Sequence, residues 1–429
     1  MFKRFIVKKL QKYVRQYFMQ HPEVKLVAVV GSVGKTSTKH AIATLLSERY
    51  RVRMHEGNHN SEVSVPLAIL GVDFPGSLRN PFTWLGVFRA AKLRIKQPTD
   101  VDVIVQELGT DAPGDIAQFG TYLLPDIAVI TGVTPEHMEF FGTIEAVAAE
   151  EMSVANFSKF VLINRDDVDA RFAALETNPN FSTYGTTGAA EYRIEQESFT
   201  FDEGYKGTIY APNFPEPFAV TVRVYGEHSL RPVMGAVATA AQLGLAPHEI
   251  GRQVALLRPV PGRMNLLRGM GETVVIDDTY NSSPAAAAAA IQTLYSFDDD
   301  NVPQRIVVLG DMRELGATSQ AEHEALARLL DSSLLAWVVL VGPESEKYMA
   351  PIARQRGCQV HIAKNAIEAG EFVRSVTEPG AVILVKGSQN TIYLEECVKL
   401  LCELTDHSQL VRQSPHWLEV KKRFFDSVV

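Results

Sequence analysis

The stretch Lys25–Glu48, KLVAVVGSVGKTSTKHAIATLLSE, decides the fold of this chain. It begins with a continuous apolar run, Leu26–Val30, which is typical of a strand buried on both faces. The tight turn Gly31–Gly34 follows, and Lys35 and Thr36 then open a predicted helix with its apolar residues on one face. A strand, a glycine turn ending in Gly-Lys-Thr and a helix together predict a cradle for phosphate groups.

The predicted cradle is formed by Gly31, Ser32, Val33, Gly34, Lys35, Thr36 and Ser37. Glycines let backbone N–H groups approach phosphate oxygens closely, and the helix N-terminus adds partial positive charge. Lys35 is predicted to neutralise the β- and γ-phosphates of a nucleotide, and the Thr36 hydroxyl to bind Mg²⁺. The pattern is the short G-x-x-G-K-T form, because Val29 stands where the longer pattern has a glycine. The alternative is a glycine-rich turn without a ligand.

Composition limits the class of protein. A chain of 429 residues with 46% apolar and 21% charged residues predicts two or three globular domains. A net charge of −8 argues against nucleic acid as a partner over the whole surface. Three cysteines without metal-binding spacing favour a reducing cytoplasm, and every apolar run is shorter than the roughly 18 residues that a membrane span needs.

Residues 1–20 are cationic and have apolar residues at helical spacing. Lysines interrupt each apolar stretch, which argues against a secretory signal. One interpretation is a helix that lies on an anionic membrane surface as a peripheral contact. The other is a helix packed on the following domain with its basic face in water.

Two further residues follow predicted strands in the first half of the chain. Glu107 comes after Val101–Val105, and His137 comes after Asp126–Ile130. The carboxyl ends of parallel strands face the crevice where α/β sheets bind ligands. We therefore predict Glu107 as a Mg²⁺ ligand and His137 as a residue beside the metal or the phosphates. The alternatives are a solvated acid and a structural histidine.

The alternation of strands and helices predicts an α/β fold with a doubly wound, mostly parallel sheet. Short runs within residues 181–225 predict antiparallel strands at its edge, and the prolines and glycine of residues 257–263 mark a domain boundary. In the following α/β unit, Asp278, Asp311 and Lys386 follow strands and are expected at one sheet edge, where a nucleotide or polar substrate would bind. The alternative, which each residue taken singly favours, is a solvated loop charge. The predicted domains are an N-terminal basic helix (1–24), a central P-loop domain (25–258) and a C-terminal Rossmann-like domain (259–429).

Ordered motifs run from about residue 25 to the C-terminus. Those of the first half are Gly31–Thr38, Glu56–Asn60 with Val65-Pro66, Glu107–Ile116, Pro125–Thr131, His137, and Asn164 with Asp166-Asp167. Those of the second half are Gly262-Arg263, Asp277–Asn281 with Pro284, Gly310–Met312 with Glu314–Gly316, and Lys386–Ser388. In this order they resemble the Mur ligases, and among them the MurF type.

The resemblance implies an ATP- and Mg²⁺-dependent ligase of peptidoglycan precursor synthesis, which joins UDP-MurNAc-tripeptide to D-alanyl-D-alanine through an acyl phosphate. It implies phosphate and first-Mg²⁺ roles for Lys35, Thr36 and Glu107, and a second-Mg²⁺ role for His137. When the two domains close, Arg263 would reach the phosphates and Asp278 the ribose. Substrate roles would fall to Asn58, Asn60, Asp111, Asn281 and Lys386.

The chain departs from the family pattern at three places. Glu151, with Glu150 before it, stands where these ligases usually carry a carbamylated lysine, and we expect its carboxylate to support the second Mg²⁺. The usual N-terminal UDP-binding domain is expected to be lacking, because 24 residues precede the first strand. The first helix or a partner protein would then bind the UDP-sugar. Pro232 replaces a usual asparagine near the adenine.

Two other functions stay open at this point. One is the same ligation on another acid and amine, of the folate or polyglutamate type. The other is a non-catalytic nucleotide-binding subunit.

Overall fold

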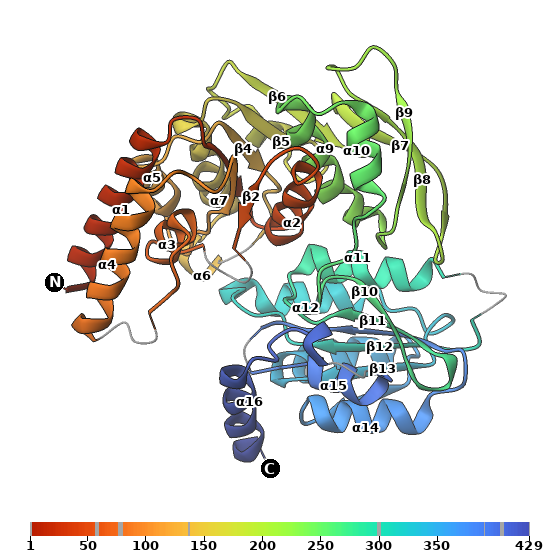
Figure 1. The fold of residues 1–429 in the computed structure, drawn as a ribbon. Coiled ribbons are helices and arrows are strands. Elements are labelled where there is room, and N and C mark those ends of the chain that lie inside the picture. The colour runs from red at the N-terminus through yellow and green to blue at the C-terminus, as the bar shows by residue number, and fades with distance from the viewer. Residues whose placement is uncertain are drawn as a thin grey trace. The chain divides into compact units, whose positions relative to one another are not determined.

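The computed structural model describes residues 2–55, 60–75, 80–135, 138–297, 302–389, 391–403 and 407–428 (Figure 1). The chain divides into two units. Unit 1 comprises Met1–Thr134, Phe140–Arg223 and Leu230–Arg258. Unit 2 comprises Pro135–Glu139, Val224–Ser229 and Pro259–Val429. The assignment of three functional domains stays a prediction.

Unit 1 is built on one large sheet, whose described strands lie in the order β2-β3-β1-β4-β5-β6-β7-β8-β9. The neighbours from β2 to β7 are parallel, and β7, β8 and β9 pair antiparallel. This confirms the predicted parallel sheet with antiparallel edge strands. The strands are β1 (Lys25–Val30), β2 (Val52–Met54), β3 (Val103–Glu107), β4 (Ile127–Ile130), β5 (Val161–Asn164), β6 (Phe181–Gly185), β7 (Tyr192–Thr200), β8 (Gly204–Tyr210) and β9 (Phe218–Val222).

Helices cover this sheet, and its central strands are buried. Leu26 through Val30 of β1 expose at most 1% of their surface, as expected for a strand covered on both faces. The helices are α1 (Phe2–Gln20), α2 (Lys35–Leu46), α3 (Ser64–Leu70), α4 (Pro81–Lys96), α5 (Asp115–Gly120), α6 (Met138–Phe141), α7 (Ile144–Met152), α8 (Ala170–Ala173), α9 (Leu230–Gln242) and α10 (Pro247–Val254). Of the helices in the described residues, none is both long and apolar enough to span a bilayer.

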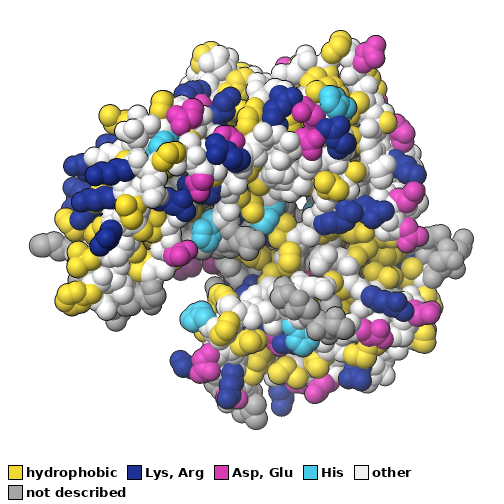
Figure 2. Space-filling view, in the orientation of Figure 1, with side chains coloured by type: hydrophobic (Ala, Val, Ile, Leu, Met, Phe, Trp, Pro, Cys, Tyr) yellow, Lys and Arg dark blue, Asp and Glu magenta, His cyan; other side chains and the backbone are white. Residues whose placement is uncertain are grey.

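Helix α1 packs through its apolar face, which was one of the two alternatives for residues 1–20. Its buried side chains face α3 and α4, and the Tyr13 and Phe88 rings meet edge to face with centroids 6.0 Å apart. The opposite face is open to solvent. Figure 2 shows Lys and Arg side chains together with hydrophobic ones over the part of unit 1 where Figure 1 places α1 and α4.

Unit 2 has its own sheet, whose described strands lie in the order β10-β11-β15-β12-β13-β14. All neighbours are parallel except β10 and β11, which confirms the predicted second α/β unit. The strands are β10 (Asn265–Arg268), β11 (Val274–Asp278), β12 (Arg305–Gly310), β13 (Trp337–Val341), β14 (Val360–Ala363) and β15 (Val382–Lys386). The helices are α11 (Pro284–Tyr295), α12 (Ser319–Ala327), α13 (Ala350–Gln355), α14 (Ala366–Val376), α15 (Glu395–Leu401) and α16 (Pro415–Val428).

Candidate functional site

The glycine turn lies between β1 and α2, as predicted. Gly31 has φ 126° and Gly34, the residue before α2, has φ 82°, a region that L-residues with side chains rarely adopt. A Cβ atom on Gly31 would also collide with the Thr131 hydroxyl and lie 2.8 Å from the backbone nitrogen of Gly132. Glycine is therefore required at position 31 both by the backbone conformation and by the closeness of the loop after β4.

The loop after β4 holds the turn in place. The Thr131 hydroxyl donates to the carbonyl oxygen of Val33 at 2.6 Å, and the Ser32 N–H donates to the carbonyl oxygen of Gly132 at 3.0 Å. The Ser32 hydroxyl oxygen accepts the N–H of Thr134 at 2.6 Å. The Ser32 N–H thus already has an acceptor within the protein. In the predicted phosphate cradle, the N–H groups from Val33 onward would therefore bind the phosphate oxygens.

Thr36 and Glu107 are brought together at the start of α2. Glu107 is the last residue of β3 and is paired in register with Val29 of β1. The Thr36 hydroxyl donates to Glu107 Oε2 at 3.2 Å, and both residues are buried. The structure therefore places the two predicted first-Mg²⁺ ligands in contact, whereas their role as ligands stays a prediction.

Two lysines of α2 lie at the same end of the sheet. Lys35 Nζ donates to the carbonyl oxygen of Gly31, inside the glycine turn. Lys39 Nζ lies 3.4 Å from Glu107 Oε2, and both side chains expose 3% of their surface. Lys39 belongs to no motif that the sequence shows, although its position four residues after Lys35 puts it on the same face of the helix. A buried carboxylate is thus balanced by a buried ammonium group beside the turn.

The two adjacent acids of α7 have different contacts. Glu151 Oε2 accepts the N–H of Gly31 at 2.8 Å, so this carboxylate lies at the glycine turn. Glu150 accepts the N–H groups of Gly114 and Ile116, at 2.7 and 2.6 Å, and thereby caps the start of α5. Of the two acids considered from the sequence, Glu151 is the one placed beside the predicted phosphate site.

The remaining candidates of unit 1 are described only in part. His137 and Asn58 lie outside the described residues. Asn60 accepts the N–H of Gly109 on its carbonyl oxygen at 3.0 Å, close after β3. Asp111 is exposed, and its N–H donates to Asp115 at 3.0 Å. Within the described parts of the chain, no three His, Cys, Asp or Glu side chains form a group that could hold a metal ion.

Unit 2 places its candidates at the carboxyl edge of its sheet. Asp278 ends β11, Lys386 ends β15, and the two are neighbours in register. Lys386 Nζ lies 2.6 Å from Asp278 Oδ2 and donates to the carbonyl oxygen of Asn281 at 3.0 Å. Asp278 Oδ1 also accepts the N–H of Met264 at 3.2 Å. Both oxygens of Asp278 therefore have partners within unit 2.

Asp311 follows β12, and its carboxylate accepts the N–H of Ser345 at 2.7 Å.

Arg263 follows a turn that Asp277 fixes. The Asp277 carboxylate accepts the N–H of Gly262 at 3.1 Å and the hydroxyl of Thr279 at 2.6 Å. Burial raises the pKa of Asp277 to about 6. The guanidinium of Arg263 lies 4.2 Å from the centroid of the Tyr280 ring, and its buried Nε has no hydrogen-bond partner among the described residues. This unpaired donor fits the predicted contact of Arg263 with a phosphate oxygen, which stays a prediction.

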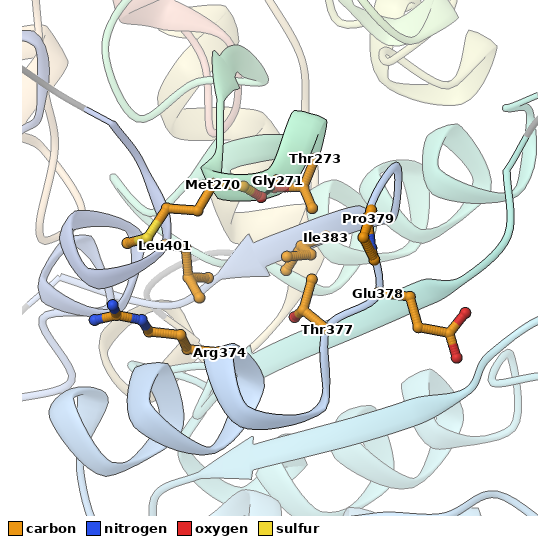
Figure 3. A pocket seen from close by; sticks show the side chains of 9 residues that line it. All are labelled: Met270, Gly271, Thr273, Arg374, Thr377, Glu378, Pro379, Ile383 and Leu401. Atoms are coloured by element: carbon orange, nitrogen blue, oxygen red, sulfur yellow. Dashed lines mark hydrogen bonds between the residues drawn. The ribbon is translucent and has the colours of Figure 1, made fainter.

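Figure 3 shows a pocket in unit 2 that none of these candidate residues lines. It is lined by Met270, Gly271, Thr273, Arg374, Thr377, Glu378, Pro379, Ile383 and Leu401. Thr377 to Pro379 precede β15 and Ile383 is near its start, whereas Lys386 is at its end. The pocket is therefore at the amino edge of the sheet, opposite the candidate residues.

Comparisons with known proteins agree with this arrangement. The family model of the Mur ligase middle domain matches residues 29–240, and that of the Mur ligase, glutamate ligase domain matches residues 262–389. A Bacillus subtilis protein named UDP-N-acetylmuramoyl-tripeptide–D-alanyl-D-alanine ligase is 27% identical over 412 residues, 92% of this chain and 79% of the relative. A Treponema pallidum protein of the same name is 27% identical over 396 residues, 91% of this chain and 78% of the relative.

Solved structures share the fold. MurF of Thermotoga maritima in complex with ADP has a TM-score of 0.73 at 23% identity, and the match covers 97% of this chain and 84% of that chain. MurF of Acinetobacter baumannii has a TM-score of 0.73 at 22% identity, covering 91% of this chain and 79% of that chain. The two family models together span most of the chain in the expected order, so this chain belongs to the Mur ligase family.

Proposed function

We propose that the chain is an ATP-dependent ligase that joins D-alanyl-D-alanine to UDP-MurNAc-tripeptide in peptidoglycan precursor synthesis. The observation that carries this proposal is the buried contact of Thr36 with Glu107 beside the glycine turn. This contact brings together a hydroxyl and a carboxylate, which a phosphoryl-transfer site needs, beside the predicted phosphate cradle. The names of the relatives that match about nine-tenths of the chain support the choice of substrates.

The residues of unit 1 fit a nucleotide with Mg²⁺. A hydroxyl and a carboxylate are oxygen ligands, and Mg²⁺ typically takes one or two carboxylates together with phosphate oxygens and water. We assign Thr36 and Glu107 to the first ion, and Glu151 with His137 to the second. When bound, Mg²⁺ would neutralise charge on the phosphate oxygens. Lys39 would hold the Glu107 carboxylate in its orientation, since its ammonium group lies 3.4 Å from that carboxylate.

The contacts in unit 2 support different roles for Arg263 and Asp278. Arg263 is proposed to bind phosphate, because its buried Nε can donate to an oxygen acceptor. Asp278 was expected at the ribose, and its ion pair with Lys386 favours instead a role in shaping the loop that carries Asn281. Asn58, Asn60, Asp111, Asn281 and Lys386 stay proposed for the substrates.

The proposed reaction proceeds in two steps. An oxygen of the tripeptide's terminal carboxylate attacks the γ-phosphorus of ATP, and the bond to ADP breaks. The amine of D-alanyl-D-alanine then attacks the acyl phosphate, phosphate leaves, and the amine loses a proton as the amide forms. Lys35 would exchange the Gly31 carbonyl oxygen for phosphate oxygens and hold the developing charge, while the turn orients the γ-phosphate.

The test is an assay of the purified full chain with ATP, Mg²⁺, UDP-MurNAc-tripeptide and D-alanyl-D-alanine. We expect ADP release that needs both substrates, and a product whose mass equals the two substrates less one water. Turnover with a folate or polyglutamate-type pair, and none with the muramoyl peptide, would move the assignment to that class. Nucleotide binding without turnover on any pair would contradict a ligase.

Cellular context is proposed on the same basis. Because the proposed substrates are nucleotide-linked, we propose the cytoplasm as the site of the reaction. If this chain alone binds UDP-MurNAc-tripeptide weakly, we propose that a partner protein binds the UDP-sugar.

A further inference from the structure

Helices α1 and α4 of unit 1 form a parallel pair. Tyr13 meets Phe88 with ring centroids 6.0 Å apart, and Lys9 Nζ lies 4.0 Å from the centroid of the same Phe88 ring. Further along both segments, the Tyr17 hydroxyl is hydrogen-bonded at 3.2 Å to Thr99, which follows the end of α4. Because the contacts advance in the same direction along both segments, the starts of the two helices lie at the same end.

Each helix carries an exposed stripe at three- and four-residue spacing. On α1 it is Phe5, Lys8, Lys12, Arg15 and Met19, and on α4 it is Phe82, Leu85, Arg89, Lys92 and Lys96. The aromatic and aliphatic side chains near the helix starts are well exposed, with Phe5 at 57%, Phe82 at 77% and Leu85 at 64%. Both stripes therefore begin with apolar side chains and continue with cations, and the α1 stripe ends in Met19, which is 81% exposed. We call the two stripes together the α1–α4 face.

The α1–α4 face concentrates positive charge on an acidic chain. The two helices contain ten lysines and arginines and no acidic residue, whereas the whole chain has a net charge of −8. Lys3 and Arg94, which lie outside the stripes, are ion-paired with Glu62 and Asp100. No acidic partner is found for the stripe cations among the described residues. The cations of this face are therefore available to bind anions outside the protein. Figure 2 shows Lys and Arg side chains gathered over this part of unit 1.

We propose that the α1–α4 face binds the surface of a bilayer that contains anionic phospholipids. The exposed side chains at the helix starts enter the interfacial region, and the lysines and arginines contact the lipid phosphates. A nucleic acid would use the cations and leave exposed Phe5, Phe82 and Leu85 without an apolar environment. Exposed apolar side chains that flank a row of cations favour a lipid surface. This inference goes beyond the proposed ligase function and does not depend on it.

Binding of this kind is peripheral and sensitive to salt. It adds no membrane-spanning element, and it depends on cations whose effect extends about 10 Å in 0.1 M salt and about 3 Å in 1 M salt. We expect the full chain to sediment with vesicles of phosphatidylcholine containing one-third phosphatidylglycerol at low salt. It should stay in the supernatant with pure phosphatidylcholine, or when salt is raised to 1 M.

The charge test is the triple variant Lys8→Gln, Lys12→Gln and Lys92→Gln. Each cation near an anionic surface contributes about fivefold to binding, so the variant should bind the vesicles about a hundredfold more weakly. The matched control replaces three exposed cations of unit 2, Arg354→Gln, Lys364→Gln and Lys422→Gln, and should bind within about twofold of the natural chain. Equal losses in the two triple variants would contradict the proposal, since net charge alone would then explain binding.

The insertion test uses Phe82→Trp, an exposed position at the apolar end. The natural chain has three tryptophans, so its emission is subtracted from that of the variant. The difference should shift to the blue with anionic vesicles and stay unchanged with neutral ones. Thermal unfolding of each variant should match the natural chain, because the replaced side chains are exposed. Absence of vesicle binding by the natural chain would overturn the proposal. Binding to a short DNA duplex without binding to vesicles would assign the face to nucleic acid instead.

Discussion

The two groups of candidate residues differ in what their lysines contact. At the glycine turn of unit 1, Lys35 donates to a backbone carbonyl and its side chain is partly exposed. At the sheet edge of unit 2, Lys386 is buried in an ion pair with Asp278. A lysine on a neutral carbonyl can exchange that acceptor for a phosphate oxygen at small cost. A buried ion-paired lysine cannot leave its carboxylate without stranding a charge. The comparison favours a direct contact of Lys35 with the ligand, whereas Lys386 would serve the proposed substrate site by holding Asp278 and the loop of Asn281 in place.

The largest expected effect is on the stability of unit 2. Lys386→Met should lower the free energy of unfolding by about 3–5 kcal/mol, because it leaves the Asp278 carboxylate buried and unpaired. Urea unfolding followed by circular dichroism measures this. The double variant Lys386→Met with Asp278→Leu should recover most of the loss. A Lys386→Met chain as stable as the natural one would remove the distinction between the two lysines.

The next effect is on activity rather than stability. Lys35→Ala should lower kcat/KM for ADP formation by about 10²–10³-fold, because one cation that holds transition-state charge is lost. Its free energy of unfolding should change by less than about 1 kcal/mol, since the side chain is partly exposed. The assay is the two-substrate ADP measurement. A stability loss as large as that of Lys386→Met would show that Lys35 is a structural lysine as well.

The third prediction concerns pH and Asp277. Its pKa in the folded chain is raised by burial to about 6, above the unfolded value, so the folded state holds this proton more tightly. Its contribution to stability is therefore present below about pH 4 and is lost as pH rises towards 6 and above. Relative to Asp277→Asn, the natural chain should lose about 1–3 kcal/mol of unfolding free energy between pH 4 and 7. Parallel pH profiles for the two chains would contradict this assignment.

The smallest expected effect is on the Mg²⁺ dependence of activity, and it should differ between the two acids of α7, Glu151 and Glu150. Glu151→Gln keeps an oxygen that can accept the Gly31 N–H and removes only the charge. We expect the Mg²⁺ concentration for half-maximal activity to rise about tenfold, or about 1.4 kcal/mol. The matched control Glu150→Gln should leave it unchanged, because Glu150 caps α5. If Glu151→Gln kept the natural Mg²⁺ dependence, Glu151 would only hold the turn.

Much of the site could be predicted because it is local. Val30, Gly31 and Lys35 are consecutive parts of one strand–turn–helix, and Glu107 and Lys386 end strands whose apolar runs are clear in the sequence. Residues 71–99 gave little such signal, yet they contain α4. Its exposed stripe holds Phe82 and Leu85 as well as cations, so its apolar residues do not fall on one buried face.

The order of residues by itself determined the α/β architecture, the turn that requires glycine, and the acids and lysines at strand ends. These follow from hydrophobic period and local backbone geometry, which act over a few residues. Only the tertiary structure decided that Glu151 and not Glu150 meets the turn, that Lys39 faces Glu107, and that Lys386 is held by Asp278. Neighbouring residues on a helix point in directions about 100° apart, and partners dozens of residues away come together only when the sheets form. The identity of a buried group's partner is therefore set by packing.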